Sequence, residues 1–187
     1  MEREALLEYI RPRMPEKRYI HTLGVMETAI SLAENYGVDP KKAEIAAILH
    51  DVAKYEETEA MRAIVREHGL DARLLSWGSE ILHGPIAAYR AEYELGIKDE
   101  DILNAMRYHT TGRAGMSRLE QIVYIADMIE PNRKFPGVEQ LRQTAKEGLQ
   151  QAMKACIHHS VLFLVTAELP IYPLSIECYN DYLGEEL

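Results

Sequence analysis

The spacing of apolar residues along the chain is helical almost throughout, and very little of it alternates with the two-residue period of a strand. The longest predicted helices run from Glu16 to Tyr36, before Gly37, and from Val138 to Glu168, with an interruption at Gly148. Shorter helices are expected over residues 5–10, 58–67, 85–95, 99–108 and 173–183. This pattern predicts an all-α protein.

Two further helices carry start signals in the sequence. Asp39 offers an N-cap carboxylate and Pro40 a first-turn proline, so a helix is predicted from this point through Lys54. Ser117 and Glu120 have the spacing of a capping box and open another helix, which ends at the EPN segment. These signals fix the helix starts more firmly than periodicity alone can.

The length of 187 residues corresponds to about one domain with a substantial buried core. The chain has no internal repeat, low-complexity tract or linker, so we expect a single all-α domain of about eight or nine helices over residues 1–187. Hydrophobic residues make up 47% and charged residues 27%, which excludes a disordered, collagen-like or coiled-coil chain.

The net charge restricts the partners. The chain has 21 basic and 30 acidic residues, a net charge of −9, whereas a protein that neutralises nucleic-acid phosphates needs the opposite balance. We therefore expect no nucleic-acid polymer as partner, and any phosphate-bearing ligand should be small and held by a local cluster of residues.

Several features are typical of the cytoplasm. Cys156 and Cys178 have no metal-binding spacing and need not be paired, which suits a reducing compartment. The first residues lack the apolar core of a signal peptide. The longest strongly apolar run, Val161 to Val165, is far shorter than the ~20 residues that span a bilayer. We expect a soluble, cytoplasmic protein without a membrane partner.

Histidines and aspartates in apolar surroundings are the candidate functional residues. His50 and Asp51 follow the apolar segment AEIAAIL, and His21 lies in the apolar-faced second helix. Asp127 is embedded in IVYIADMI, where an ionised carboxylate is costly unless it is paired or bound to a metal. His83 precedes a Gly-Pro helix start. The candidate metal ligands are His21, His50, Asp51, His83, His109 and Asp127.

This donor set contains nitrogen and oxygen atoms and no thiolate, which favours iron, manganese or a similar divalent metal over a cysteine-type structural zinc site. Six ligands suit two ions better than one if a carboxylate bridges them. Asp51 is the natural bridge, because its neighbour His50 can bind one ion while its second oxygen reaches the other. Two ions about 3.5–4 Å apart can clamp a phosphoryl group and generate a hydroxide nucleophile.

The order His…His-Asp…His…His…Asp resembles the HD superfamily of metal-dependent phosphohydrolases. The fuller segments RYIHTLGV, AAILHDVAKY, LHGPIAA, MRYHTTGR and YIADMIEPNR are similar to those of the bacterial YqeK family, over about Leu6 to Leu183. Members of that family are symmetrical diadenosine tetraphosphate hydrolases with a dinuclear iron centre. The resemblance implies an HD-domain helical bundle and symmetrical cleavage to two ADP, by attack of a hydroxide, activated by the two metal ions, on an inner phosphorus.

The resemblance also implies which residues hold each ion. By comparison with the family, His21, His50, Asp51 and Asp127 would hold one iron, and Asp51, His83 and His109 the other. Manganese or another transition metal is the alternative. Asp51, His83, His109 and Lys54 form the expected catalytic set, in which His83 or His109 could assist proton transfer and Lys54 stabilises developing charge.

A polyphosphate bridge needs cations and hydrogen-bond donors besides the metals. Lys54 lies one turn after His50, Arg18 lies three residues before His21, and Arg133 follows the EPN break. Tyr172, next to a proline helix start, is expected to line the nucleotide end of the site. The candidate substrate-binding residues are Arg18, Lys54, His83, His109, Thr110, Arg133 and Tyr172, with Arg113 as a weaker candidate.

Two other interpretations stay open. The same metal centre could serve an HD-type phosphohydrolase of another nucleotide, such as a monophosphate or a cyclic dinucleotide, with different substrate contacts. A non-catalytic module that senses nucleotides is the second. A helical interaction protein would leave the Asp127 carboxylate without a partner. The expected partner is a small nucleotide, a dinucleoside polyphosphate, and a homodimer is left open.

Overall fold

The computed structural model describes residues 2–184, and these residues contain ten α-helices and no strand. The ends of the expected domain over 1–187 lie outside these residues. The helices are α1 (Arg3–Ile10), α2 (Glu16–Tyr36), α3 (Pro40–Leu49), α4 (Thr58–Glu67), α5 (Ser79–Leu95), α6 (Glu100–Arg107), α7 (Arg118–Ile129), α8 (Val138–Glu147), α9 (Leu149–Thr166) and α10 (Pro173–Leu183), with 3-10 turns at Arg11–Arg13 and Ala72–Ser76. The all-α prediction is confirmed.

The capping signals act as the sequence predicts. The Asp39 carboxylate accepts a hydrogen bond from the backbone N–H of Lys41 at 2.8 Å, at the start of α3. Ser117 and Glu120 form both hydrogen bonds of the capping box at the start of α7. Gly37 ends α2 in the left-handed conformation, with φ of 65°, which glycine adopts without the cost of a Cβ atom.

Two predicted boundaries are wrong. The α3 helix ends at Leu49 rather than Lys54, and the chain continues in tight turns such as the one closed by Lys54 N–H and the Asp51 carbonyl at 2.9 Å. Helix α5 begins at Ser79 and carries Pro85 inside it, because its apolar face is buried on both sides of the proline. The interruption predicted at Gly148 is confirmed, and it separates two helices, which brings the number to ten among the described residues where eight or nine were expected.

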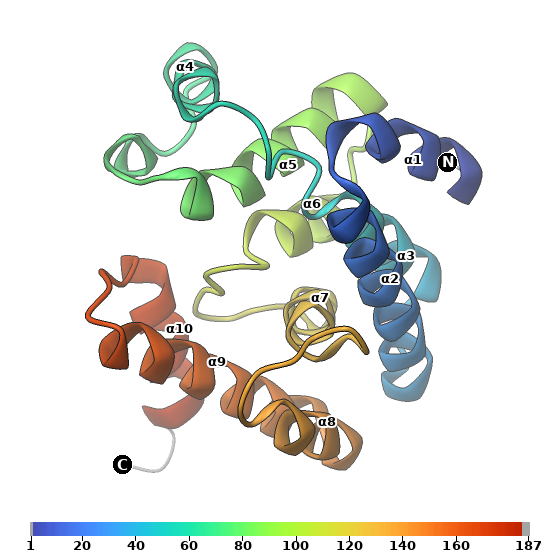
Figure 1. The fold of residues 1–187 in the computed structure, drawn as a ribbon, viewed down its shortest axis with the longest axis vertical. Coiled ribbons are helices and arrows are strands. Elements are labelled where there is room, and N and C mark those ends of the chain that lie inside the picture. The colour runs from blue at the N-terminus through green and yellow to red at the C-terminus, as the bar shows by residue number, and fades with distance from the viewer. Residues whose placement is uncertain (1, 185–187) are drawn as a thin grey trace.

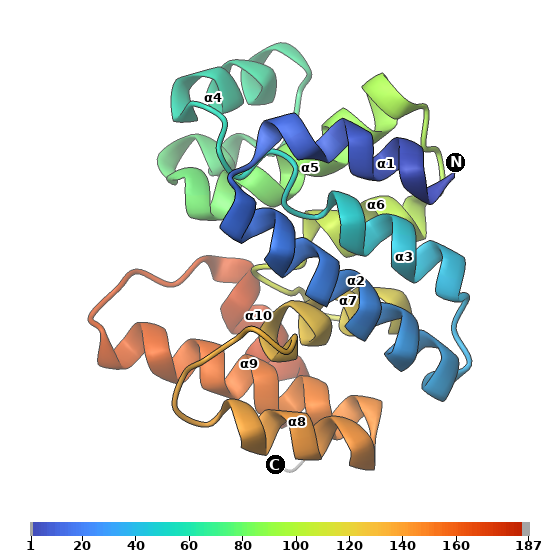
Figure 2. The same cartoon turned by 45° about the vertical axis from the view of Figure 1, so that its right-hand side comes forward.

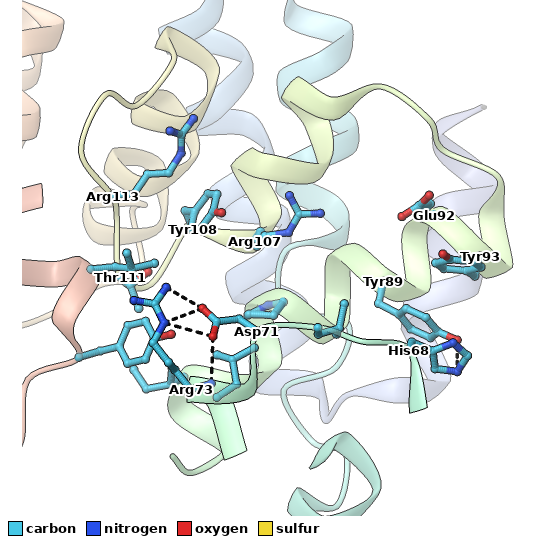
Figure 3. A pocket seen from close by; sticks show the side chains of 16 residues that line it. His68, Asp71, Arg73, Tyr89, Glu92, Tyr93, Arg107, Tyr108, Thr111 and Arg113 are labelled. Atoms are coloured by element: carbon cyan, nitrogen blue, oxygen red, sulfur yellow. Dashed lines mark hydrogen bonds and ion pairs between the residues drawn. The ribbon is translucent and has the colours of Figure 1, made fainter. Parts of the chain in front are cut away.

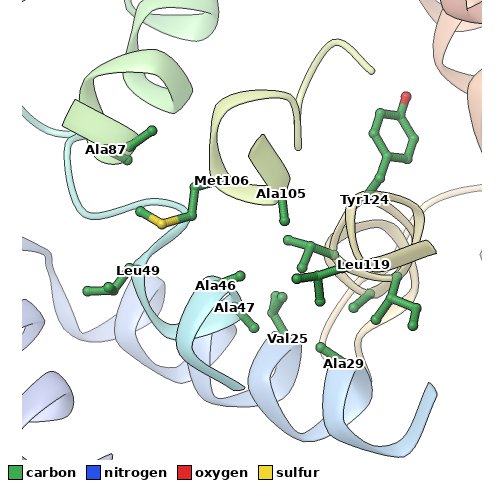
Figure 4. Close-up of a cluster of buried hydrophobic side chains, with 14 of the residues drawn as sticks. Val25, Ala29, Ala46, Ala47, Leu49, Ala87, Ala105, Met106, Leu119 and Tyr124 are labelled. Atoms are coloured by element: carbon green, nitrogen blue, oxygen red, sulfur yellow. The ribbon is translucent and has the colours of Figure 1, made fainter. Parts of the chain in front are cut away.

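Helix α7 lies in the middle of the bundle and contacts helices on both sides (Figures 1 and 2). It packs against α2, α3 and α6 on one side and against α8 and α9 on the other, while α10 packs on α9. Val25 of α2, Ala46 and Ala47 of α3 and Leu119 of α7 meet in the core between these helices (Figure 4). The short alanine side chains let α3 approach its neighbours closely.

A glycine sets the distance between α5 and α6. A Cβ atom at Gly84 would lie 2.9 Å from the carbonyl oxygen of Arg107 and 3.1 Å from that of Met106. Backbone atoms cannot give way as a flexible side chain can, so the close approach requires glycine. Because His83 precedes this glycine and His109 follows α6, the contact also brings these two histidines together.

Two further features concern the apolar helices and the cysteines. Within residues 2–184, no helix is both long and apolar enough to span a lipid bilayer. Cys156 and Cys178 are free thiols, and both side chains are buried.

We expect Gly84→Ala to lower the free energy of unfolding by about 1–3 kcal/mol, because the added methyl group overpacks the contact between α5 and α6. Denaturant unfolding followed by circular dichroism measures the change. Gly184→Ala is the control, because nothing lies within 4 Å of a Cβ atom at that position and its backbone is right-handed helical. Equal stability of the two variants would contradict this account of the contact.

Candidate metal centre

The structure brings all six predicted ligands to one place. They come from α2 (His21), the turn after α3 (His50 and Asp51), α5 (His83), the turn after α6 (His109) and α7 (Asp127). The four histidines and Asp51 are buried, and Asp127 is partly exposed. Residues up to 106 positions apart in the sequence therefore form one polar cluster inside an apolar bundle.

The Asp51 carboxylate lies at the centre of the cluster. Its Oδ1 atom is 3.2 Å from Nε2 of His83 and 3.7 Å from Nε2 of His109. Its Oδ2 atom is 3.3 Å from Nε2 of His50 and 3.9 Å from Nε2 of His21. The two oxygen atoms thus face two different pairs of imidazoles.

Each imidazole pair has a further oxygen beside it. Oδ1 of Asp127 lies 3.0 Å from Nε2 of His21 and 4.0 Å from Nε2 of His50. On the other side, the Nε2 atoms of His83 and His109 are 3.0 Å apart. The Thr110 hydroxyl lies 3.3 and 3.1 Å from these two nitrogens, respectively.

The other ring nitrogen of each histidine fixes the tautomer. In His50, His83 and His109, Nδ1 lies 2.6, 2.9 and 2.7 Å from the carbonyl oxygen of a residue three or four positions earlier. A carbonyl only accepts, so Nδ1 carries the proton and the lone pair is on Nε2. In His21, Nδ1 lies 3.1 Å from the Glu130 carboxylate. All four Nε2 atoms are therefore oriented as ligands.

The residues fit a divalent metal centre. The Nε2 atoms of His21 and His50 are buried and make no hydrogen bond, which is costly unless a cation accepts their lone pairs. Ligand atoms of His21, His50 and Asp127 lie within 4.8 Å of one another, and so do those of His50, Asp51 and His109. Nitrogen and oxygen donors of this kind suit transition metals.

Electrostatics keep the ligands in the protonation states that bind metals. Burial alone raises the pKa of the Asp51 carboxyl, but the imidazoles of His50, His109 and His83 hold it well below its usual range. Burial lowers the pKa of His83, which favours its neutral form. Near neutral pH, Asp51 is therefore a carboxylate that faces a neutral His83 imidazole.

The two predicted phosphate-binding arginines contact the ligand carboxylates. Arg18 donates to Oδ2 of Asp51 at 2.9 Å, and Arg133 donates to Oδ1 of Asp127 at 2.6 Å and to its carbonyl oxygen at 2.8 Å. Burial raises the pKa of the Asp127 carboxyl, but contact with His21 and the charge of Arg133 hold it far below its usual range. Both guanidinium groups are partly exposed, at the rim of the site.

Two predicted substrate residues do not join the cluster. The ammonium group of Lys54 bonds Oε2 of Glu80 at 2.6 Å instead. Tyr172 is buried, with its ring edge-on to Trp77 at a centroid distance of 5.1 Å.

Tyr172 lines a separate cavity of about 220 Å³. Figure 3 shows other residues of its lining, among them Arg73 and Tyr89. Its lining includes Tyr108, Thr111 and Arg113 but none of the six ligands. Arg113, the weaker candidate, bonds Oε1 of Glu120 at 2.8 Å and lies over the Tyr108 ring.

The sequence analysis missed two carboxylates, Glu80 beside Lys54 and Glu130 beside His21. Glu80 is exposed, and nothing in its sequence surroundings distinguishes it. Glu130 is 1% exposed and follows the apolar run that contains Asp127. Like Asp127, Glu130 is therefore a charge next to apolar sequence that needs a partner.

Comparison with known proteins agrees with this arrangement. The HD domain family matches residues 18–132, which include all six predicted ligands. A symmetrical bis(5'-nucleosyl)-tetraphosphatase from Halalkalibacterium halodurans is 48% identical over 100% of both chains. Its Bacillus subtilis counterpart is 48% identical over 96% of this chain and 97% of its own, and the Staphylococcus aureus counterpart is 46% identical over 92% and 90%.

A solved structure has the same fold. The crystal structure of a predicted HD superfamily hydrolase involved in NAD metabolism, from Clostridium acetobutylicum, superposes with a TM-score of 0.92 at 38% identity, over 99% of this chain and 98% of that one. The helical bundle and its histidine–aspartate centre are those of the HD class. The chain belongs to the HD domain family and, within it, to the YqeK family of the full-length relatives.

We expect Asp51→Asn to weaken metal binding by at least about tenfold, because an amide presents an oxygen to one imidazole pair and an N–H donor to the other. Titration with Mn²⁺, with the free ion measured by electron paramagnetic resonance, gives the affinity. Asp71→Asn is the control, because Asp71 pairs with Arg73 away from the cluster. If Asp51→Asn bound Mn²⁺ as tightly as the wild type does, this would contradict a central role of the Asp51 carboxylate in metal binding.

Proposed function

We propose that this protein hydrolyses diadenosine tetraphosphate at the centre of its polyphosphate bridge and releases two ADP. The observation that carries the proposal is the convergence of six ligand side chains in a chain 48% identical, along its whole length, to a symmetrical tetraphosphatase. The acidic net charge of −9 agrees with a small substrate rather than a nucleic-acid polymer.

We further propose that the centre holds two divalent or trivalent metal ions, with iron as the metal and manganese as the alternative. The orientation of Asp51 supports a bridging role, because one oxygen faces His21 and His50 and the other faces His83 and His109. Such ions, when bound, polarise phosphoryl oxygens and lower the pKa of water. Asp127 would complete the ligand set on the side of His21 and His50.

Arg18, Arg133 and Thr110 would bind the phosphates. Both guanidinium groups reach the centre and remain partly exposed, so they can make charge-assisted hydrogen bonds to phosphate oxygens. The Thr110 hydroxyl, between the Nε2 atoms of His83 and His109, can donate to the same group. These donors stabilise negative charge as it develops on the attacked phosphate.

Lys54 would join the site when substrate binds. Its partner Glu80 has a side chain that is 77% exposed, and an ion pair with so exposed a carboxylate contributes little free energy. A polyphosphate carries more negative charge than one carboxylate, so it can compete for the ammonium group. ADP is a competent leaving anion, so His83 or His109 needs to assist proton transfer only weakly.

Tyr172 would line the nucleotide end of the site. It is the N-cap residue of α10, and it lies between Trp77 and a cavity that Tyr108 also lines. Aromatic rings of this kind can pack against a nucleobase. Arg113, at the same cavity, is already paired with Glu120 and is the weaker candidate.

The proposal includes a cytoplasmic location, which the free thiols of Cys156 and Cys178 support. A homodimer stays a prediction, and analytical ultracentrifugation at several protein concentrations tests it. A single sedimenting species of 21.4 kDa at all concentrations would contradict a dimer.

We expect anaerobically purified protein to convert diadenosine tetraphosphate into ADP alone. Chromatography of the products checks this, and AMP plus ATP would mean attack at a different phosphorus. In H₂¹⁸O, a single cleavage at the centre puts the label on the terminal phosphate of one ADP of each pair. Turnover of a nucleoside monophosphate or a cyclic dinucleotide instead would favour another phosphohydrolase, and binding without turnover would favour a sensor.

We expect Tyr172→Ala to raise KM about tenfold, in line with the stacking of a base on an aromatic ring, and to leave the bound metal unchanged. Steady-state kinetics and metal analysis of the same preparation check both parts. Tyr172→Phe keeps the ring and serves as the control. Loss of metal in the alanine variant would make Tyr172 a structural residue instead.

A further inference from the structure

Glu130 is a buried carboxylate with partners on both oxygens. Its Oε1 atom lies 3.1 Å from Nδ1 of His21, and its residue is 1% exposed. Its Oε2 atom accepts two hydrogen bonds from Asn132, one from the backbone N–H at 2.7 Å and one from the side-chain amide at 3.0 Å. Glu130 is therefore held in place by Asn132 and directed at a metal-ligand histidine.

His21 needs such a partner more than the other three histidines do. In His50, His83 and His109, Nδ1 is fixed by a backbone carbonyl of the chain just before it. His21 lies inside the 21-residue helix α2, and its Nδ1 atom turns to a side chain from beyond the end of α7. The side chain at position 130 is thus the partner that holds Nδ1 of His21.

Gly24 makes room for the carboxylate. It lies three residues after His21 on α2, a spacing that puts two positions on the same face of a helix. A Cβ atom at this position would lie 2.4 Å from Oε2 of Glu130 and 3.4 Å from Nδ2 of Asn132. Glycine weakens the interior of a helix, and here its lack of a side chain allows Glu130 to approach.

We propose that Glu130 is a positioning residue for His21. Its carboxylate accepts a hydrogen bond from Nδ1–H of His21, so that Nε2 faces the carboxylates of Asp51 and Asp127 and is free to bind a metal ion there. Carboxylates that orient a ligand histidine in this way fix its ring and raise its basicity. The inference rests on the metal centre proposed above and is independent of the substrate.

Glutamine at position 130 is a sharp probe because it has the same shape and one oxygen fewer. If its amide nitrogen faces His21, the proton on that ring must move to Nε2, where it points into the metal site. If its amide nitrogen faces Asn132 instead, a donor replaces the oxygen that accepted both hydrogen bonds from Asn132, and these two bonds are lost. In either orientation Glu130→Gln disturbs the arrangement that holds His21.

The first test reads the tautomer directly in metal-free protein labelled with ¹⁵N-histidine. Two-bond ¹H–¹⁵N correlation spectra distinguish an Nδ1 proton from an Nε2 proton, and the spectrum of His21→Gln assigns the signal. Nε2 of His21 also faces a carboxylate in metal-free protein, so the reading is taken at Nδ1 alone. We expect Nδ1 of His21 to carry a proton in the wild type and to lose it in Glu130→Gln.

The second test measures Mn²⁺ affinity by the same titration as for Asp51→Asn. Loss of a partner that orients a ligand histidine weakens metal binding about 10–100-fold, and we expect Glu130→Gln to fall in this range. Glu120→Gln is the matched control, because Glu120 is also 1% exposed but contacts Arg113. It should leave both the affinity and the His21 tautomer unchanged, even where it lowers Tm.

Gly24→Ala provides a second variant that keeps the carboxylate. Its added methyl group displaces Glu130, so it should shift the His21 tautomer and weaken Mn²⁺ binding in the same direction as Glu130→Gln. Because both changes act through one contact, their losses of Mn²⁺ affinity should not add. The double variant should bind Mn²⁺ about as weakly as the weaker-binding of the two single variants.

The outcomes distinguish failure of the metal centre from failure of the role of Glu130. If the wild type fails to bind Mn²⁺, Co²⁺ and Fe²⁺, the metal centre itself is refuted. If the wild type binds Mn²⁺ and Glu130→Gln and Gly24→Ala keep its affinity and the wild-type tautomer, the role of Glu130 is refuted and the centre stands. An equal loss of affinity in Glu120→Gln would also refute it, because the effect would then be a general one of buried glutamates.

Discussion

The ionised carboxylate of Asp51, buried among four imidazoles, is the interaction on which the rest of the structure depends. A buried charge is very unfavourable unless it is compensated: Arg18 donates a hydrogen bond to it, and a cation held between the carboxylate and the imidazoles would compensate the rest. Because these groups come from α2, α5 and the turns after α3 and α6, the helices must pack so that they meet. The need to satisfy one carboxylate thus constrains the relative positions of most of the bundle.

The packing of the helices meets this constraint with small residues at close contacts. Gly84 lets α5 approach the carbonyl groups at the end of α6, and Ala46 and Ala47 let α3 lie close to its neighbours. Gly24 does the same for the carboxylate of Glu130. In each case the absence of side-chain atoms in one helix admits a group from another, and the polar centre can form without an empty space in the core.

Much of this arrangement could be predicted from the sequence, for identifiable physical reasons. Caps such as Asp39 and Ser117 act locally, so a few neighbouring residues determine where their helices start. The six ligands could be identified because charged and imidazole groups in apolar sequence need partners, and because their order resembles a known family. That argument required no knowledge of which helices pack together.

The failures have a common cause in tertiary contacts. The helix predicted through Lys54 ends at Leu49, where the chain tightens into turns, and Pro85 lies inside α5 because burial on both sides outweighs its local effect. Lys54 pairs with Glu80, 26 positions away, and Glu130 reaches His21, 109 positions away. No local pattern reports such pairs, and they appear only once the helices are placed.

The distance along the chain between the ligands has a thermodynamic consequence. His21 and Asp127 are 106 positions apart, so no short fragment contains the set, and the donors are brought together by the docking of separate helices. Cation affinity and cooperative folding are then linked functions of the same native state. A substitution that weakens the packing between two helices, even far from any donor atom, would therefore also lower the affinity for the metal ion.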